Sequence, residues 1–166
     1  MGFDLHGMNP ETSEPQPMWD KGDPFVKNGN EYTVDPQIKE EYDDYLKSKF
    51  DWQDSNEGTY FRNNVWWWRP LWNFVCSTCA DILTEKDIEG GSLNDGHRIS
   101  KTKSKRIAKR LRKFLKEGDV DAYESYYKRK VSQLAKDDWN KNYPFHADNV
   151  KQFERFCEKS GGFEIY

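Results

Sequence analysis

GTYFRNNVWWWRPLWNFVCSTCADIL, residues 58–83, places three consecutive tryptophans between two asparagines and an arginine. Pro70 follows, and proline lacks the N–H that a helix interior needs and disfavours helical backbone at the residue before it. We therefore expect a helix to begin at Pro70, with residues 63–68 forming either a separate helical turn or an extended lead-in. An apolar stripe at helical spacing predicts its buried face: Leu71, Phe74, Val75, Thr78, Cys79 and Ile82.

Four more helices are predicted on either side of this stretch. Asp35 and Pro36 are a typical N-cap and first helical residue, and the periodic positions after them continue to about Phe50. Ser100 and Gly118 frame a second helix. Asp119 can cap a third, which continues to about Leu134, and the last one contains Val150, Phe153, Phe156 and Cys157 before the pair Gly161 and Gly162.

Short strands are predicted at the two ends of the chain. Phe3 and Leu5 alternate with polar neighbours, as do Phe163 and Ile165, and a two-stranded ribbon of this length needs helices to rest on. Residues 9–30 are rich in Pro, Gly and Asn and are expected to form a loop. The predicted fold is mainly α (α+β): a single domain, 1–166, of about five helices with a short β-ribbon formed by the two termini.

The composition favours a core built from rings. Only 35% of the residues are apolar, whereas aromatic residues reach 16%. No apolar run is long enough for a membrane span, and no leader sequence precedes the first strand, so we expect an intracellular, cytoplasmic protein with no membrane partner. Three cysteines do not suggest a disulfide framework.

Charge is strongly segregated along the chain. Residues 1–60 carry 14 acidic and 5 basic side chains, whereas residues 98–116 carry 10 basic and no acidic ones. We interpret residues 12–57 as an acidic insertion with one helix within the domain. The acidic and basic segments are expected either to attract each other or to recruit partners of opposite charge.

Several motifs together resemble a family of uncharacterised small proteins from phages and from bacterial or marine metagenomic sequence. The motifs are MGFDLHG at the start, FRNNVWWWRPLW, the NDG turn, and the ending YPF…SGGFEI. The resemblance covers residues 1–7, 60 to about 116, and 143–166. Relatives lack most of the acidic stretch 12–57, and many carry paired CxxCxGxG zinc motifs after the position of Leu134. The resemblance implies a phage-type protein in a host cell, and it implies no zinc site here.

The RNNVWWWR motif has two interpretations. Tryptophans offer rigid contact area, and asparagine and arginine side chains offer paired hydrogen-bonding groups suited to a carboxylate, a phosphate or a base edge. Alternatively, the tryptophans are core and the asparagines cap the helix. Neighbouring residues of a helix point in different directions, so at least one tryptophan should leave the core layer. The candidate ligand-binding residues here are Arg62, Asn63, Asn64, Trp67 and Arg69.

The NDGHR motif supplies three further candidates, Asn94, Asp95 and His97. Asp95 and His97 could form an acid–base pair, and histidine titrates near neutral pH. Asn, Asp and Gly also form tight turns for conformational reasons alone. These residues would either join the Arg62–Arg69 group in one site, serve a small hydrolase or transferase, or only shape a turn.

Cys76 and Cys79 form a C-x-x-C pair within the predicted helix. A zinc site needs two more ligands, and no second C-x-x-C supplies them. Buried cysteines behave as small apolar side chains. We therefore predict no metal and no cofactor.

The basic run from Arg98 to Lys116 predicts a helix with a Lys/Arg face. Such a face can bind nucleic acid through phosphate contacts, here through Lys105, Lys109 and Arg112. The alternative is a solvated face neutralised by the acidic insertion, which the overall pI of 5.7 favours.

Taken together, these residues predict a phage-type accessory binding or interaction module. It would recognise a small anionic or planar polar ligand, or a protein partner. Nucleic-acid binding through residues 98–116 and catalysis by Asp95 and His97 are the two alternatives, and no complete catalytic signature favours an enzyme.

Overall fold

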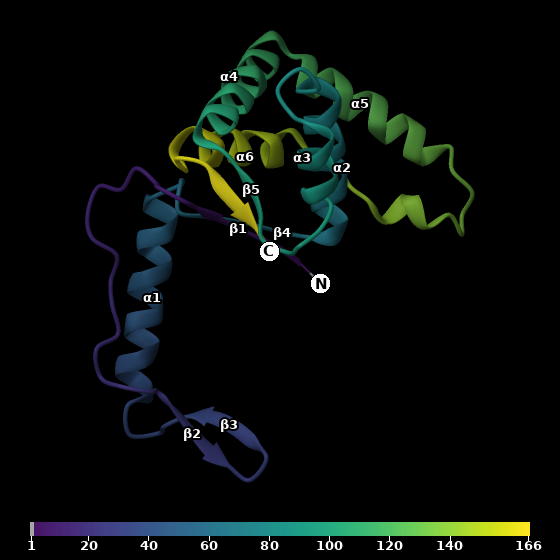
Figure 1. Ribbon diagram of the computed structural model, residues 1–166. Helices are drawn as coiled ribbons and strands as arrows, with labels where there is room; N and C mark the ends of the chain where they lie inside the picture. The colour runs from purple at the N-terminus through teal and green to yellow at the C-terminus, as the bar shows by residue number, and fades with distance from the viewer. Residues whose placement is uncertain (1) are drawn as a thin grey trace. The chain divides into compact units, whose positions relative to one another are not determined.

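A four-stranded antiparallel sheet joins both ends of the chain in the computed structural model, which describes residues 2–166 (Figure 1). The order is β4-β1-β6-β5, with bounds β1 (Gly2–Gly7), β4 (Tyr60–Asn64), β5 (His97–Ile99) and β6 (Phe163–Ile165). The predicted terminal ribbon is confirmed, because β1 pairs with β6 with Leu5 opposite Ile165. Strands β4 and β5 were not predicted.

One face of this sheet is apolar and the other is polar, because side chains alternate along a strand. Phe3, Leu5, Phe61 and Ile165 share the buried face. Asn63 lies opposite Phe3, so its amide side chain is on the buried face of the sheet, close to the start of α2.

Helices supply the rest of the core, and the mainly helical α+β prediction is confirmed, with six α-helices and 52% helix in the part of the chain described. In the unit that contains the sheet they are α2 (Val65–Thr78), α3 (Glu85–Gly90), α4 (Lys101–Glu117), α5 (Asp119–Ser132) and α6 (Ala147–Lys159), with a short 3-10 helix η1 (Trp139–Asn142). Helix α4 packs along α6.

The prediction that a helix begins at Pro70 was wrong, because α2 begins at Val65 and Pro70 lies inside it. The side-chain oxygen of Asn64 accepts hydrogen bonds from the backbone N–H of Trp66 at 3.0 Å and of Trp67 at 3.1 Å. This cap satisfies two N–H groups that a helix start leaves without partners. Because Pro70 has no N–H, the carbonyl of Trp66 loses its helical hydrogen bond. The two hydrogen bonds of the Asn64 cap offset this loss.

The three tryptophans spread around α2, as expected for consecutive helical residues. Trp68 is fully buried, and its indole N–H donates to the carbonyl of Gly91 at 2.7 Å. Trp66 and Trp67 are half-buried. Trp68 therefore belongs to the core, whereas Trp66 and Trp67 are partly exposed at the surface.

Replacing the capping residue should destabilise the protein measurably. We expect Asn64→Ala to lower the free energy of unfolding by about 1 kcal/mol, which lowers Tm by about 2–4 °C in a domain of this size. Thermal unfolding followed by circular dichroism measures the shift. Asn73→Ala, at an exposed position within the same helix, is the control and should stay within about 0.5 kcal/mol of the parent. Equal effects of the two changes would contradict the capping role.

The predicted ends of α4 are confirmed. Ser100 is the N-cap and its hydroxyl accepts from the backbone N–H of Lys103, while Gly118 ends the helix with a φ of 82°. Asp119 was predicted to cap α5, which was wrong. Gly118 takes that position as well, and Asp119 is the first helical residue. The link between the helices is so short because one glycine in the left-handed conformation ends one helix and starts the other.

The chain separates into two compact units, one of Met1–Glu11 with Glu57–Tyr166 and one of Thr12–Asn56. The second unit, which spans nearly the residues interpreted as an acidic insertion, contains β2 (Phe25–Asn28), β3 (Glu31–Val34) and α1 (Lys39–Ser55). The β2–β3 hairpin contradicts the expected loop over residues 9–30. Its two-residue turn starts at Gly29 with a φ of 64°, a conformation that suits a tight hairpin.

Candidate functional site

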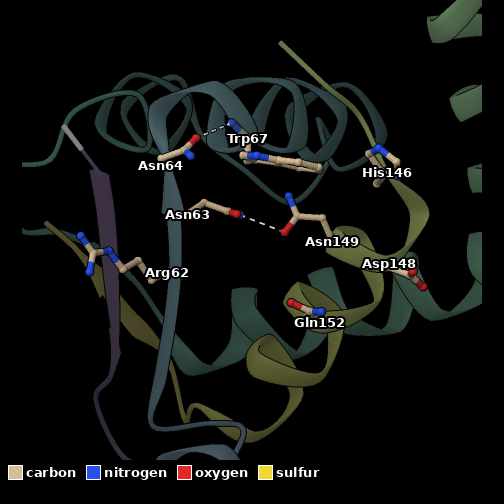
Figure 2. Close-up of a pocket in the computed structure, with 8 residues that line it drawn as sticks. All are labelled: Arg62, Asn63, Asn64, Trp67, His146, Asp148, Asn149 and Gln152. Atoms are coloured by element: carbon tan, nitrogen blue, oxygen red, sulfur yellow. Dashed lines mark hydrogen bonds between the residues drawn. The ribbon is translucent and has the colours of Figure 1, made fainter. Parts of the chain in front are cut away.

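A cleft of 670 Å³ opens between the end of β4, the first turn of α2 and the first half of α6 (Figure 2). Four of the residues that line it come from the predicted site, namely Arg62, Asn63, Asn64 and Trp67. Four others were not predicted, namely His146, Asp148, Asn149 and Gln152. The structure therefore joins the FRNN motif to α6, a segment more than 80 residues later in the sequence.

Carboxamides dominate the polar lining of this cleft. The amide nitrogen of Asn63 donates to the side-chain oxygen of Asn149 at 3.0 Å, both side chains being half-buried. A carboxamide has two N–H donors and an oxygen with two lone pairs, so a single bond leaves both residues with further capacity. Asn64 uses its oxygen in the helix cap, and Gln152 is exposed beside them. The cleft thus offers donors and acceptors that carry no net charge.

Two rings form one side of the cleft. The rings of Trp67 and His146 lie 5.1 Å apart between centroids at an angle of 37°. Figure 2 shows the indole of Trp67 above the Asn63–Asn149 pair, with His146 beyond it. A flat apolar surface next to amide groups suits a ligand that is itself flat and polar at its edge.

Formal charges in the cleft are few and opposed. The guanidinium of Arg62 lies 3.4 Å from the carboxylate of Asp4 on the neighbouring strand, and Asp148 adds an exposed carboxylate. Asp4 also accepts from the hydroxyl of Tyr60, and burial together with this bond raises the pKa of Tyr60 to about 12. The positive charge of Arg62 is thus opposed by the carboxylates of Asp4 and Asp148, so the lining offers an anion no unopposed cation.

Arg69 faces a different surface from the residues in the cleft. Its guanidinium donates to the hydroxyl of Tyr143 at 3.0 Å and lines a separate groove of 170 Å³ beside Asn73 and Tyr127. The sequence predicted Arg69 in the same site as Arg62, but the turn of α2 between them directs the two side chains to different grooves.

Asn94, Asp95 and His97 are not among the residues that line the cleft. Asn94 and Asp95 are exposed in the turn before β5, which Gly96 closes with a φ of 90°. The Nε2 atom of His97 lies 3.1 Å from the carboxylate of Asp87. The carboxylate partner of His97 is thus Asp87, in α3, and not its neighbour Asp95.

Asp87 lies at the centre of a nearly buried polar cluster. Its carboxylate accepts from the backbone N–H and hydroxyl of Thr84, from Lys103 and from His97. Burial by itself would raise the pKa of Asp87, but the hydrogen bonds from Lys103, Thr84 and His97 outweigh it and hold the pKa well below its usual range. The cluster links α3, β5 and α4 through these hydrogen bonds, which is the arrangement of a structural tie.

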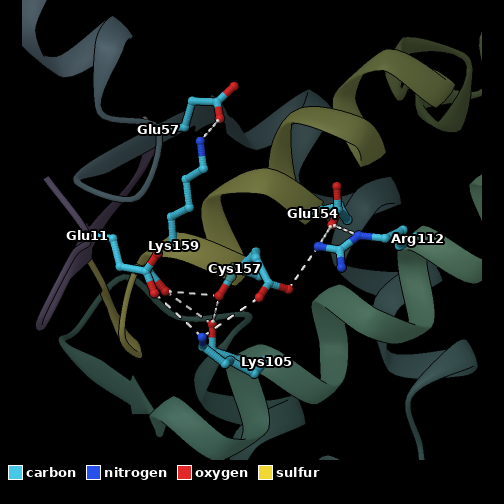
Figure 3. A network of polar contacts seen from close by, with 10 residues as sticks. Glu11, Glu57, Lys105, Arg112, Glu154, Cys157 and Lys159 are labelled. Atoms are coloured by element: carbon cyan, nitrogen blue, oxygen red, sulfur yellow. Dashed lines mark hydrogen bonds and ion pairs between the residues drawn. The ribbon is translucent and has the colours of Figure 1, made fainter. Parts of the chain in front are cut away.

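The basic helix α4 is neutralised mostly by carboxylates of its own unit (Figure 3). Arg112 donates to Glu154 at 2.6 Å and to Glu158 at 2.8 Å, both on α6. Lys105 lies 3.5 Å from Glu11 and 3.8 Å from Glu158. Asp81 in turn accepts from Arg110 at 3.0 Å. The sequence suggested the acidic insertion as the neutralising partner, whereas these carboxylates all lie outside it.

Three cations were predicted to bind nucleic acid. Among them, Lys109 is exposed and forms no ion pair with the residues that the structure describes. Lys105 and Arg112 are held against α6 (Figure 3). A phosphate would have to compete with carboxylates already bonded to them, which weakens the nucleic-acid alternative for this helix.

The cysteines are shielded rather than reactive. Burial raises the pKa of Cys76 to about 12 and also raises the pKa values of Cys79 and Cys157. Within residues 2–166, no group of three or more His, Cys, Asp and Glu side chains is arranged to hold a metal ion.

The polar residues of α6 were not predicted, because the apolar stripe of that helix indicates its buried face alone. Asn149 and Gln152 are three residues apart, so they share a helical face beside the stripe. That spacing of two amides was the available signal. His146 is the residue directly before α6, and Asp148 lies in the first turn of that helix.

Comparisons of the chain with protein-family models, with curated protein sequences and with solved structures gave no match. Among the helices of residues 2–166, none combines the length and the apolar character needed to cross a membrane.

Proposed function

We propose that the cleft binds a neutral, planar polar ligand such as a nucleobase or a related heterocycle. The observation that carries this proposal is the gathering of Asn63, Asn64, Asn149 and Gln152 around the indole of Trp67. Asparagine and glutamine side chains pair in bidentate fashion with the edge of a base such as adenine. An aromatic ring beside them can stack on the face of the same base.

The charges of the site favour a neutral ligand over an anionic one. Arg62 has Asp4 as its partner, and Asp148 would repel a phosphate or a carboxylate. The amides and the rings that dominate the lining suit the binding of such a ligand. From the motif resemblance, we further propose that this binding serves a phage-type accessory role in the cytoplasm of a host cell.

Nucleosides without phosphate provide the test. We expect adenosine or another nucleoside to show saturation-transfer NMR signals with the full chain, and Asn63→Ala and Asn149→Ala each to weaken its affinity about tenfold, which is about 1.4 kcal/mol per variant. Isothermal titration measures the affinities. Asn94→Ala, in the exposed turn before β5, is the matched control and should bind as the parent does.

Two results would overturn the proposal. One is that no nucleoside of a complete set binds while a protein partner or an anion does. The other is binding that the alanine variants at Asn63 and Asn149 leave unchanged while Asn94→Ala reduces it.

A further inference from the structure

A row of aromatic and cationic side chains continues from the cleft across the start of α2 and the segment before α6. It consists of Trp66, Arg69, Trp139, Lys141 and Tyr143, and we call it the aromatic band. The rings of Trp66 and Trp139 are nearly parallel, 6.2 Å apart at 10°, and Trp66 lies 4.9 Å from Tyr143. Trp139 is 71% exposed, which is unusual for so large an apolar side chain.

The band adjoins the cleft at Trp66 and Tyr143, while its Arg69 lines the separate groove described above. Trp66 and Trp67 are consecutive, and each packs on the same extended segment, Trp66 on Tyr143 and Trp67 on His146. His146 lines both the cleft and a groove of 280 Å³ that also includes Tyr143 and Lys141. The cleft and this groove thus meet at His146, and the groove reaches Lys141 and Tyr143 of the band.

The two cations of the band differ from Lys105 and Arg112 of α4, which are held in ion pairs. The guanidinium carbon of Arg69 lies 5.9 Å from the ring centre of Tyr143, and Lys141 is exposed. Within residues 2–166, neither has a carboxylate at ion-pair distance, whereas Arg112 and Lys105 do. Arg69 and Lys141 thus keep their charge for a ligand outside the chain.

The net charge of the unit that carries the band also favours a polyanion. The other unit, Thr12–Asn56, has 11 acidic and 5 basic side chains, a net charge of −6. Since the whole chain has a net charge of −3, the unit with the band carries +3. The overall pI hides this balance, because it averages two units of opposite sign.

We infer that the aromatic band and the cleft together bind single-stranded nucleic acid, an inference that rests on the proposed function of the cleft. Unpaired bases stack on aromatic side chains, and flanking cations contact the phosphates. Trp66 and Trp139 supply the stacking surface, and Arg69 and Lys141 the phosphate contacts. The amides of the cleft read the edge of one base, where Asp148 would oppose a phosphate. The polar face of the sheet also presents aromatic rings, but its cations are already in ion pairs, Arg62 with Asp4 and Arg98 with Glu164.

Fluorescence anisotropy with the full chain tests this inference. The probes are 12-nucleotide oligo(dT), oligo(dA) and oligo(U), together with a duplex of the same length. We expect single strands to bind at least tenfold more tightly than the duplex. Because two phosphates are contacted, with a slope of about −0.7 each, affinity should fall about sevenfold between 50 and 200 mM salt. The DNA and RNA arms show whether a 2′-hydroxyl is required.

Matched variants locate the binding surface. Trp139→Ala should weaken oligonucleotide binding about tenfold, whereas Tyr32→Ala, an exposed aromatic of the other unit, should not change it. The double variant Arg69→Gln/Lys141→Gln should nearly abolish the salt dependence. Lys109→Gln/Lys116→Gln removes the same charge from exposed positions of α4 and should leave both affinity and salt dependence intact.

The possible results separate the band from the cleft. Nucleoside binding that Asn149→Ala weakens, with oligonucleotides binding no more tightly, overturns the band and leaves the cleft. Oligonucleotide binding that depends on Trp139 but not on Asn149 supports the band and overturns the cleft. Equal affinity for duplex, loss of binding in the α4 double variant, or Trp139-dependent binding of an oligosaccharide instead of an oligonucleotide would each overturn the inference.

Discussion

Trp68→Ala is expected to lower the free energy of unfolding by about 4 kcal/mol, the usual cost of deleting a fully buried tryptophan. The indole stacks on Phe3 at 5.4 Å and on Trp72 at 5.3 Å, so its removal leaves a cavity between the sheet and α2. It also leaves the carbonyl of Gly91 without its donor. Because native domains are stable by about 5–15 kcal/mol, this loss is a large share of the total. Urea denaturation followed by circular dichroism measures it.

Two further variants show whether the effect belongs to this position. Trp139→Ala, at an exposed tryptophan, should change stability by less than about 0.5 kcal/mol. Trp68→Phe should recover part of the loss, because it keeps a stacked ring but not the N–H donor. A loss below about 1 kcal/mol for Trp68→Ala would show that this side chain is not part of the core.

Asp87→Asn is expected to destabilise the protein by about 3 kcal/mol at pH 7. The carboxylate is almost fully buried and holds Lys103, His97 and Thr84, and removing one partner of a buried ion pair costs about 3–5 kcal/mol. The lower end applies because Lys103 is partly exposed. Asp81→Asn is the matched control. Asp81 is an exposed carboxylate paired with Arg110, and its loss should cost less than about 1 kcal/mol.

The destabilisation by Asp87→Asn should depend on pH in one direction. The folded-state pKa of Asp87 is lowered from its ordinary value of 3.8, so the ionised carboxylate stabilises the fold at pH values above that value. As the pH falls below about 4 toward the lowered pKa, this contribution is lost and the two proteins should converge in stability. Urea denaturation at several pH values from 7 to 3 measures the difference. A difference that grows on acidification would contradict this role for Asp87.

Local features of the fold could be predicted because they depend on residues close in sequence. The helix framed by Ser100 and Gly118 was identified from its capping serine and its terminal glycine, each of which acts on the residues next to it. The start of α2 was misplaced because Pro70 was given more weight than Asn64. Both signals are local, but their relative strength depends on the capping geometry, which here gives two hydrogen bonds.

The candidate site could be predicted only in part, for a related reason. The amides and rings of the FRNN and tryptophan motifs were identified by their chemistry, yet their partners are His146, directly before α6, and Asn149 within it. Similarly, His97 was paired with Asp95 on sequence proximity, whereas β5 places it against Asp87 in α3. Contacts of this kind depend on how elements pack, and a sequence pattern of period 2 or 3.6 carries no information about them.

The sequence by itself determined the helical character of the chain, the strands at its two ends and the segregation of its charges. These follow from side-chain periodicity, capping residues and composition. Only the tertiary structure decided that β4 lies beside β1, that the cations of α4 contact Glu154 and Glu158, and that amides from β4 and α6 meet in one cleft. The physical reason is that the apolar face of the sheet and the apolar faces of the helices are buried against one another. This packing brings together residues that are far apart in the sequence.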